Sequence, residues 1–146
     1  KETLDKLGQV GFWKISMKPG RPLSFGRVGK ANFFGLPGNP VSAMVTFYQI
    51  VLPALNAMMG KSDVEAITIQ ARCVTPLKKR SGRVEFQRGI LEQDAQGQMV
   101  VRSTGHQGSH ILRSMSQANC FIILPLESPG TAADEMVTVQ PFYGLL

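Results

Sequence analysis

The sequence predicts an α+β chain in two parts, one with a long helix and one built from short strands. Two observations carry this prediction. Apolar residues recur at helical spacing between positions 41 and 59, and from position 67 onward apolar and polar residues alternate with a period of two. The polar stretch 61–66 between these patterns is typical of a linker. We therefore expect two domains, 1–62 and 63–146.

The composition is that of a folded protein with a basic surface. Of 146 residues, 43% are hydrophobic, which is enough to bury a core and excludes intrinsic disorder. Sixteen Lys and Arg against ten Asp and Glu give a net charge of +6, which favours an anionic partner without selecting one. No apolar run approaches the roughly 18 residues of a membrane-spanning helix, and no signal peptide is evident. We expect a soluble, cytoplasmic protein without a membrane partner, and the absence of an initial Met favours a fragment.

The first elements alternate between strand and turn signals. Leu4 and Leu7, followed by Gly8, fit the last turn of a helix with a glycine stop. A strand is expected from Gly11 to the break at Pro19. Its two faces would carry Trp13, Ile15 and Met17 on one side and Lys14, Ser16 and Lys18 on the other. Lys14 and Lys18 would then lie on one face, about 13 Å apart at ~3.3 Å per residue.

A hairpin and a helix complete the first half. Two apolar runs, 23–25 and 32–36, are joined by a glycine-containing segment that indicates a hairpin. The helix that follows has Asn39 as a suitable N-cap, Pro40 at its first position and Gly60 as its stop. Pro53 should kink it. Because apolar residues occupy several of its faces, we expect burial over much of its circumference.

The second half reads as five short strands and one helical turn. The strand candidates are 67–73, 84–91, 99–104, 120–124 and 136–139. Turn signals separate them, and a helical turn is expected near 109–115. This pattern predicts a small β-barrel or sandwich. Cys73 and Cys120 lie far apart without zinc-ligand spacing, so both are expected to be reduced in the core.

The segment Leu36-Pro37-Gly38-Asn39-Pro40-Val41-Ser42 is the first candidate site. A strand enters a rigid turn and then a helix N-terminus, where free backbone N–H groups and the helix dipole favour an anion. Gly38 would let a ligand approach the backbone closely. An ordinary strand-to-helix connection with good capping explains the same residues, and on physical grounds alone it is the commoner arrangement.

Three basic residues upstream of that turn form the second candidate site. Lys14, Lys18 and Arg21 would make a phosphate-binding ledge if the hairpin brings them beside Pro37. The alternative is the solvated polar face of an edge strand, which is the more frequent role for lysines at alternate positions.

The glycine-rich loop before the expected helical turn is the third candidate. It contains His106, Gln107, Gly108 and Ser109, followed by His110. The two histidines are four residues apart, but no nearby Glu, Cys or third His supports zinc, so we expect capping and hydrogen bonding. A loop of this composition can also contact an anionic substrate through its backbone N–H groups.

Arg88 shares a predicted strand face with apolar residues, so it requires either a carboxylate or a ligand anion as its partner.

The cluster Lys78, Lys79 and Arg80 is interpreted as a solvated turn, because no aromatic residues interleave with it as nucleic-acid binding requires. The acidic residues fall mostly at termini, linkers and turns. No paired carboxylates suit acid–base work or Mg²⁺ binding, so any active site must be completed elsewhere.

Four motifs together resemble one family. They are Phe12-Trp13-Lys14, Met17-Lys18-Pro19-Gly20-Arg21-Pro22, Phe34-Gly35-Leu36-Pro37-Gly38-Asn39-Pro40-Val41-Ser42 and Gly105-His106-Gln107-Gly108-Ser109-His110. In this order they resemble the C-terminal half of the molybdopterin molybdenumtransferases, the MoeA type of bacteria and the gephyrin E-domain type of animals. The resemblance covers essentially the whole chain.

The resemblance implies a fold and a reaction. The chain would be the C-terminal part of a MogA-like α/β molybdopterin-binding domain followed by a complete small β-barrel domain. The parent would be an elongated, four-domain, cytoplasmic homodimer supplied with substrate by a molybdopterin adenylyltransferase. It would be a transferase that inserts molybdate into adenylylated molybdopterin and releases AMP with Mg²⁺. The acidic metal-site residues would lie outside this chain, so the fragment alone is expected to be inactive.

The resemblance also implies roles for individual residues. Lys14, Lys18, Pro37, Pro40, Arg88 and Ser109 match the family's active-site cleft. We expect catalytic roles for Lys14, Lys18 and Arg88, no metal ligands in this chain, and substrate contacts from Arg21, Pro37, Gly38, Asn39, Pro40, Ser42, His106, Gln107, Gly108 and Ser109. Arg21 stands where the family often has lysine, which keeps the charge but changes its geometry.

Two rival functions are weighed against this one. A non-catalytic scaffold of the gephyrin type would hold a peptide against exposed aromatic residues, for which Phe33, Phe34 and Tyr143 are candidates. An RNA-binding barrel would explain the charge, but the sequence lacks the stacking pattern of aromatic and basic residues, so no nucleic-acid partner is expected.

Overall fold

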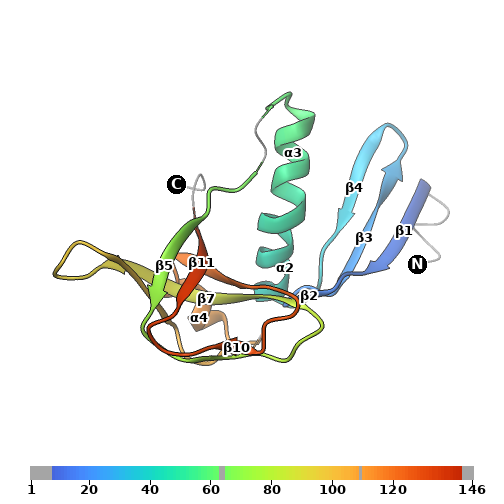
Figure 1. Cartoon of the computed structure of the whole chain (residues 1–146). Coiled ribbons are helices and arrows are strands. Elements are labelled where there is room, and N and C mark those ends of the chain that lie inside the picture. Colours follow the sequence, from blue (N-terminus) through green and yellow to red (C-terminus); the bar gives the residue numbers. More distant parts are fainter. Residues whose placement is uncertain (1–7, 63–64, 109, 143–146) are drawn as a thin grey trace. The chain divides into compact units, whose positions relative to one another are not determined.

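The computed structural model describes residues 8–62, 65–108 and 110–142 (Figure 1). The chain divides into two compact units, Lys1–Val64 and Glu65–Leu146, and each is described by itself. The helix end expected at residues 4–7 lies outside the described residues, and Gly8 opens a strand.

In the described part of the first unit, three strands form an antiparallel sheet in the order β1-β3-β4. These strands are β1 (Gly8–Lys14), β3 (Pro22–Val28) and β4 (Ala31–Gly35). The predicted hairpin between β3 and β4 is confirmed, with a longer first strand and a tighter turn. Val28 pairs with Ala31, so the turn consists of Gly29 and Lys30, and the φ of +60° at Gly29 suits glycine.

The prediction of one continuous strand from Gly11 to the break at Pro19 is wrong in one respect. β1 ends at Lys14, and a separate two-residue strand, β2, contains Met17 and Lys18. The β1–β3 register ends where Lys14 meets Pro22, which has no N–H to continue the ladder. Lys14 and Lys18 therefore do not share an uninterrupted strand.

The predicted helix and its caps are confirmed. It runs as α2 (Pro40–Thr46), a π-helical segment η1 (Phe47–Val51) and α3 (Leu52–Met58). The Asn39 side chain accepts hydrogen bonds from the backbone of Val41 at 3.1 Å and Ser42 at 3.3 Å. Just before Pro53 the helix makes a π-helical turn, in which the Leu52 N–H donates to the Phe47 carbonyl.

Burial of this helix is less complete than expected. α2 and η1 contribute buried side chains, but no residue of α3 is buried, and Met58 is 51% exposed. An open apolar groove, lined in part by Trp13 and Phe25 of the sheet and Ile50 and Ala54 of the helix, separates the two layers. One sheet can cover only one side of a helix, and here it leaves that groove open.

The same helix corrects the expectation that no apolar run is long enough to span a membrane. Pro40–Met58 has 19 residues and is long and apolar enough by length and composition. This is weak evidence for a membrane segment, because the core helix of a soluble protein passes the same test. One third of the apolar window (33%) is buried within the structure.

In the described part of the second unit, five strands close into a barrel, which decides between the barrel and the sandwich. They are β5 (Ile69–Cys73), β7 (Val84–Gln93), β8 (Met99–Ser103), β9 (Cys120–Leu124) and β11 (Met136–Pro141). They pair in the order β7-β8-β5-β11-β9, and β9 pairs back onto β7. The pairing of β5 with β8 is parallel and the others are antiparallel. Short elements complete the unit: β6 (Leu77–Lys78), β10 (Gly130–Thr131) and the expected helical turn, α4 (Leu112–Ser116).

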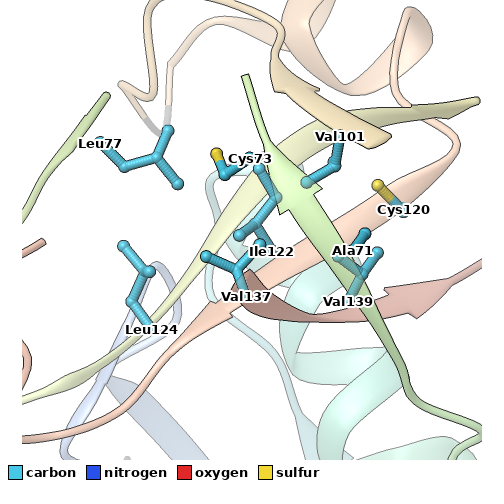
Figure 2. Close-up of a cluster of buried hydrophobic side chains, with 9 residues drawn as sticks. All are labelled: Ala71, Cys73, Leu77, Val101, Cys120, Ile122, Leu124, Val137 and Val139. Carbon is cyan, nitrogen blue, oxygen red and sulfur yellow. The ribbon is translucent and has the colours of Figure 1, made fainter. Parts of the chain in front are cut away.

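Alternate residues of these strands fill the barrel (Figure 2). The cluster comprises Ala71, Cys73, Leu77, Val101, Cys120, Ile122, Leu124, Val137 and Val139. Both cysteines are unpaired and buried, as predicted. Burial raises the pKa of the Cys120 thiol to about 12, so this thiol stays protonated at neutral pH.

A charged cluster on the barrel surface supports the turn after β7. Arg72 donates to Asp134 at 2.7 Å and to Asp94 at 3.1 Å. Asp94 also accepts backbone hydrogen bonds from Gln98 at 2.9 Å and Gln96 at 3.0 Å. The Gln98 bond is the largest cause that holds the pKa of Asp94 below its usual range, and Arg72 acts in the same direction.

We expect Asp94→Asn to lower the stability of the second unit at neutral pH. Because the pKa of Asp94 is depressed in the folded state, its contribution is present above the pKa of an unfolded Asp, about 3.9, and is lost as pH falls through the folded value. Urea unfolding between pH 7 and pH 2.5 should therefore show a difference from wild type that disappears in acid. A difference that stays constant with pH would contradict this role.

Candidate functional site

The basic turn between β1 and β3 is held against the long helix. The Ile15 N–H donates to the Arg21 carbonyl at 2.8 Å, which closes the turn. Gly20 has a φ of +104°, and a Cβ there would lie 2.5 Å from the Thr46 hydroxyl and 3.4 Å from the Ser42 carbonyl. Only glycine fits this approach. The turn that carries Lys18 therefore packs on the first turns of α2.

The cations of this turn face outward. Lys14, Lys18 and Arg21 are exposed. The neighbouring Thr46 hydroxyl is buried and has no hydrogen-bond partner in the part of the chain that the structure describes. The turn thus carries exposed positive charges on one side and packs closely on the helix on the other.

In and beside the turn at residues 37–40, some groups cap or pack the helix and others are exposed to solvent. The Asn39 side chain is engaged in capping, and Ser42 is buried in the helix. Gly38, by contrast, is exposed, and a Cβ at this position would meet nothing within 4 Å. The open surface of this turn is therefore the backbone around Gly38, with half-buried Pro37 on one side and exposed Pro40 on the other.

In the second unit the glycine-rich loop is tied to β7. The side-chain amide of Gln107 makes two hydrogen bonds with the backbone of Arg88. Its oxygen accepts from the Arg88 N–H at 2.7 Å, and its nitrogen donates to the Arg88 carbonyl at 3.0 Å. His106 and His110 are exposed. Ser109 lies outside the described residues.

The side chain of Arg88 donates its hydrogen bonds to neutral groups, and the carboxylate of Glu85 lies close enough to act on its charge. Arg88 is 1% exposed, its Nε donates to the Ser114 hydroxyl at 3.1 Å, and its Nη2 donates to the Gly108 carbonyl at 3.1 Å. Burial lowers the pKa of the guanidinium, and the nearby Glu85 carboxylate acts in the opposite direction. Arg88 is thus part of the packing between β7, the loop and α4.

Sequence reasoning did not single out Gly20, Thr46 or Ser114. Gly20 was interpreted as part of the strand break and of a family motif but not as a point of close packing, although a glycine after a proline in a basic turn is a signal of close approach. Thr46 and Ser114 carry no motif, because their importance arises from residues distant in the sequence. Glu85 was also missed, although its period-two relation to Gln87 places both on the barrel side of β7.

The described ranges 8–62, 65–108 and 110–142 contain no group of three or more His, Cys, Asp or Glu side chains that could hold a metal ion. The residues in these ranges therefore do not fit Mg²⁺.

Each of the two units matches a different known protein domain. Residues 70–142 match the MoeA C-terminal region (domain IV), and residues 1–57 match a probable molybdopterin binding domain. The chain belongs to the molybdopterin molybdenumtransferase (MoeA) family. The chain is 47% identical over 147 residues to the molybdopterin molybdenumtransferase of Haemophilus influenzae, with all of this chain and 36% of that protein covered.

More distant MoeA relatives give the same result. Gephyrin of Dictyostelium discoideum is 34% identical over 148 residues, with 86% of this chain and 21% of gephyrin covered. A crystal structure of the MoeA protein of Pyrococcus horikoshii superposes with a TM-score of 0.77 at 28% identity, covering 94% of this chain and 33% of that one. This chain spans about a third of the length of the first of these MoeA relatives.

Two glycines of the site should respond in opposite ways to the same change. Gly20→Ala should destabilise the first unit by about 1–3 kcal/mol, because of its φ and the contact with Thr46. Gly38→Ala should leave stability unchanged, because its surroundings are open, but should weaken binding of an anionic substrate that approaches the backbone there. Thermal unfolding and substrate titration of the full-length protein would measure both effects. Equal melting temperatures for the two variants would contradict the packing of Gly20.

Proposed function

We propose that the full-length protein inserts molybdate into adenylylated molybdopterin and releases AMP. The observation that carries this proposal is the 47% identity to a molybdopterin molybdenumtransferase over the whole of this chain. The outward-facing cations beside an open helix N-terminus support it, because the substrate carries phosphate groups and molybdate is itself an oxyanion.

The first unit supplies charge and shape. Lys14, Lys18 and Arg21 hold the phosphate or oxyanion charge, and the two lysines stabilise the negative charge that develops as AMP leaves. The turn from Pro37 to Pro40 forms a wall of the site, in which Gly38 gives access to the backbone. Asn39 and Ser42 act through the cap that orders this turn.

The second unit supplies the glycine-rich loop. Its residues His106, Gln107, Gly108 and Ser109 belong to the substrate-binding surface in this proposal. Arg88 places a positive charge directly behind the loop, since its guanidinium donates to the Gly108 carbonyl. Such a buried charge is screened less by salt than an exposed one.

The remaining parts of the proposal concern the whole protein. Mg²⁺ is held by residues outside this chain. The protein acts as a homodimer in the cytoplasm, receives adenylylated molybdopterin from a molybdopterin adenylyltransferase, and has neither a nucleic-acid nor a membrane partner. The similarity to the MoeA relatives supports these statements as a group.

A non-catalytic scaffold of the gephyrin type is the second candidate. The similarity to Dictyostelium gephyrin favours it, as do the aromatic side chains exposed on the first unit. These are Phe12, Trp13 and Phe25, which are 51%, 50% and 40% exposed. Of the aromatic residues expected to serve a scaffold, Phe33 and Phe34 are half-buried, and Tyr143 lies outside the described residues.

Lys18→Ala should reduce AMP release by the full-length protein about tenfold or more, because it removes a charge from the phosphate-binding ledge. The assay uses adenylylated molybdopterin, molybdate and Mg²⁺. Lys30→Ala is the matched control, since Lys30 is exposed at the hairpin turn, remote along β4 from residue 37. Unchanged release by Lys18→Ala would remove Lys18 from the site. No release by wild type would favour the scaffold.

The 146-residue chain alone should release no AMP under the same conditions, because its described residues offer no metal-binding cluster. Release by this chain at the rate of the full-length protein would show that the active site is complete within it.

A further inference from the structure

The imidazole of His110 folds back over the glycine-rich loop that precedes it. A Cβ placed on Gly108 would lie 2.8 Å from Cε1, 3.2 Å from Nδ1 and 3.4 Å from Nε2 of the His110 ring. The three atoms nearest to that position all belong to this ring. The imidazole therefore packs against the backbone of Gly108, in the space that a side chain at residue 108 would need.

The backbone conformation of Gly108 does not itself require glycine. Its φ lies outside the left-handed region, unlike that of Gly105 at +93°. An alanine at position 108 would therefore fit the backbone and would collide first with the imidazole of His110. Because that ring stands at the end of a side chain that can change its rotamer, the alanine would displace the ring and leave the loop in place. The glycine at position 108 keeps the imidazole where it is.

The carbonyl of Gly108 is engaged within the protein, whereas the imidazole is available to a ligand. That carbonyl accepts from the Arg88 Nη2 at 3.1 Å and from the Ile111 N–H at 3.1 Å. His110 is exposed, and its ring nitrogens make no hydrogen bond with the residues that the structure describes. A ligand that approaches Gly108 from the side where a Cβ would project therefore meets the imidazole first.

We propose that His110 is a further substrate-binding residue, whose imidazole donates a hydrogen bond to an anionic group of the substrate at the glycine-rich loop. An imidazole offers one N–H donor when neutral and two when protonated, and both forms suit phosphate or molybdate oxygens. This inference rests on the proposed function, which places the loop at residues 106–109 on the substrate-binding surface. The contact between the ring and Gly108 is a property of the protein without substrate.

The first measurement tests the position of the ring in the absence of substrate. In the full-length protein, with histidine labelled at Cε1 for NMR, Gly108→Ala should shift the His110 Cε1–H resonance, because the added methyl group displaces the ring. Gln117→Ala is the matched control, since Gln117 is exposed at the end of α4, and it should leave that resonance unchanged. A His110 resonance that does not respond to Gly108→Ala would overturn the contact whether or not the protein is an enzyme.

The second measurement is the equilibrium binding of adenylylated molybdopterin without molybdate, so that insertion cannot proceed. We expect His110→Ala to raise the Kd about tenfold with little change in melting temperature, because it removes one hydrogen bond to an anionic group and an exposed side chain. His110→Gln should recover part of the affinity, since its amide retains a donor. Addition of the substrate to the wild type should also shift the His110 Cε1–H resonance, which a purely structural residue would not show.

Gly108→Ala distinguishes contact by the imidazole from contact by the loop backbone. It should weaken binding about as much as His110→Ala does, and the double variant should be no worse than either single one, because both changes remove the ring from the same place. Multiplied effects, about a hundredfold in the double variant, would place the substrate directly on Gly108 and overturn the proposal.

Each other outcome has a defined meaning. Wild-type affinity in His110→Ala would overturn the role of His110 and leave the proposed function intact. A lower melting temperature with an unchanged Kd would assign His110 to folding alone and overturn the proposal as well. If His110→Ala fails to fold, Gly108→Ala provides the same test, because it displaces the ring without removing it. Absence of both substrate binding and AMP release in the wild type would refute the proposed function, and with it this inference, while the NMR comparison would still report on the ring.

Discussion

The pairing of β7 with β9 closes the barrel, and the arrangement of the second unit depends on it. Over Glu85–Gly89 the register with β9 places Glu85, Gln87 and Gly89 on the side of the buried cluster, opposite Leu124, Ile122 and Cys120. Gly89 has no side chain because a Cβ would come within 3.0 Å of Ile122 and Cys120. The intervening Arg88 must then point away from the barrel interior, where the loop and α4 receive it. Barrel closure and the conformation of the loop are consequences of one register.

In the first unit, the end of the β1–β3 pairing at Pro22 is a comparable constraint. The hairpin ladder ends at Pro22, which cannot donate a hydrogen bond, and the chain forms a turn that carries Lys18 and Arg21. Gly20 lets this turn pack on Ser42 and Thr46 of the helix. The same helix begins at the Asn39 cap, next to Gly38. Close packing at Gly20 therefore holds the basic turn against the first two turns of this helix.

Much of this architecture was predictable from local patterns. The helix, its cap at Asn39, the β3–β4 hairpin and the strands of the second half follow from periodicity and turn chemistry, because these depend on residues close in sequence. The predictions that were wrong involve longer-range effects. The continuity of β1 beyond Lys14 depended on its partner Pro22, and the burial of α3 depended on how far the sheet covers it. Candidate site residues could be named, but their partners could not.

Arg88 and Gln107 illustrate where the two sources of information divide. The sequence by itself determined that the chain is α+β, that it carries a capped helix with basic residues upstream, and through its motifs that it belongs to the MoeA family. Only the tertiary structure decided that the barrel closes, that Arg88 is buried and donates to Gly108 and Ser114, and that Gln107 faces the backbone of a strand 19 residues away. The physical reason is that periodicity reports which face of an element is apolar, whereas hydrogen-bond partners are selected by register and by where neighbouring strands end.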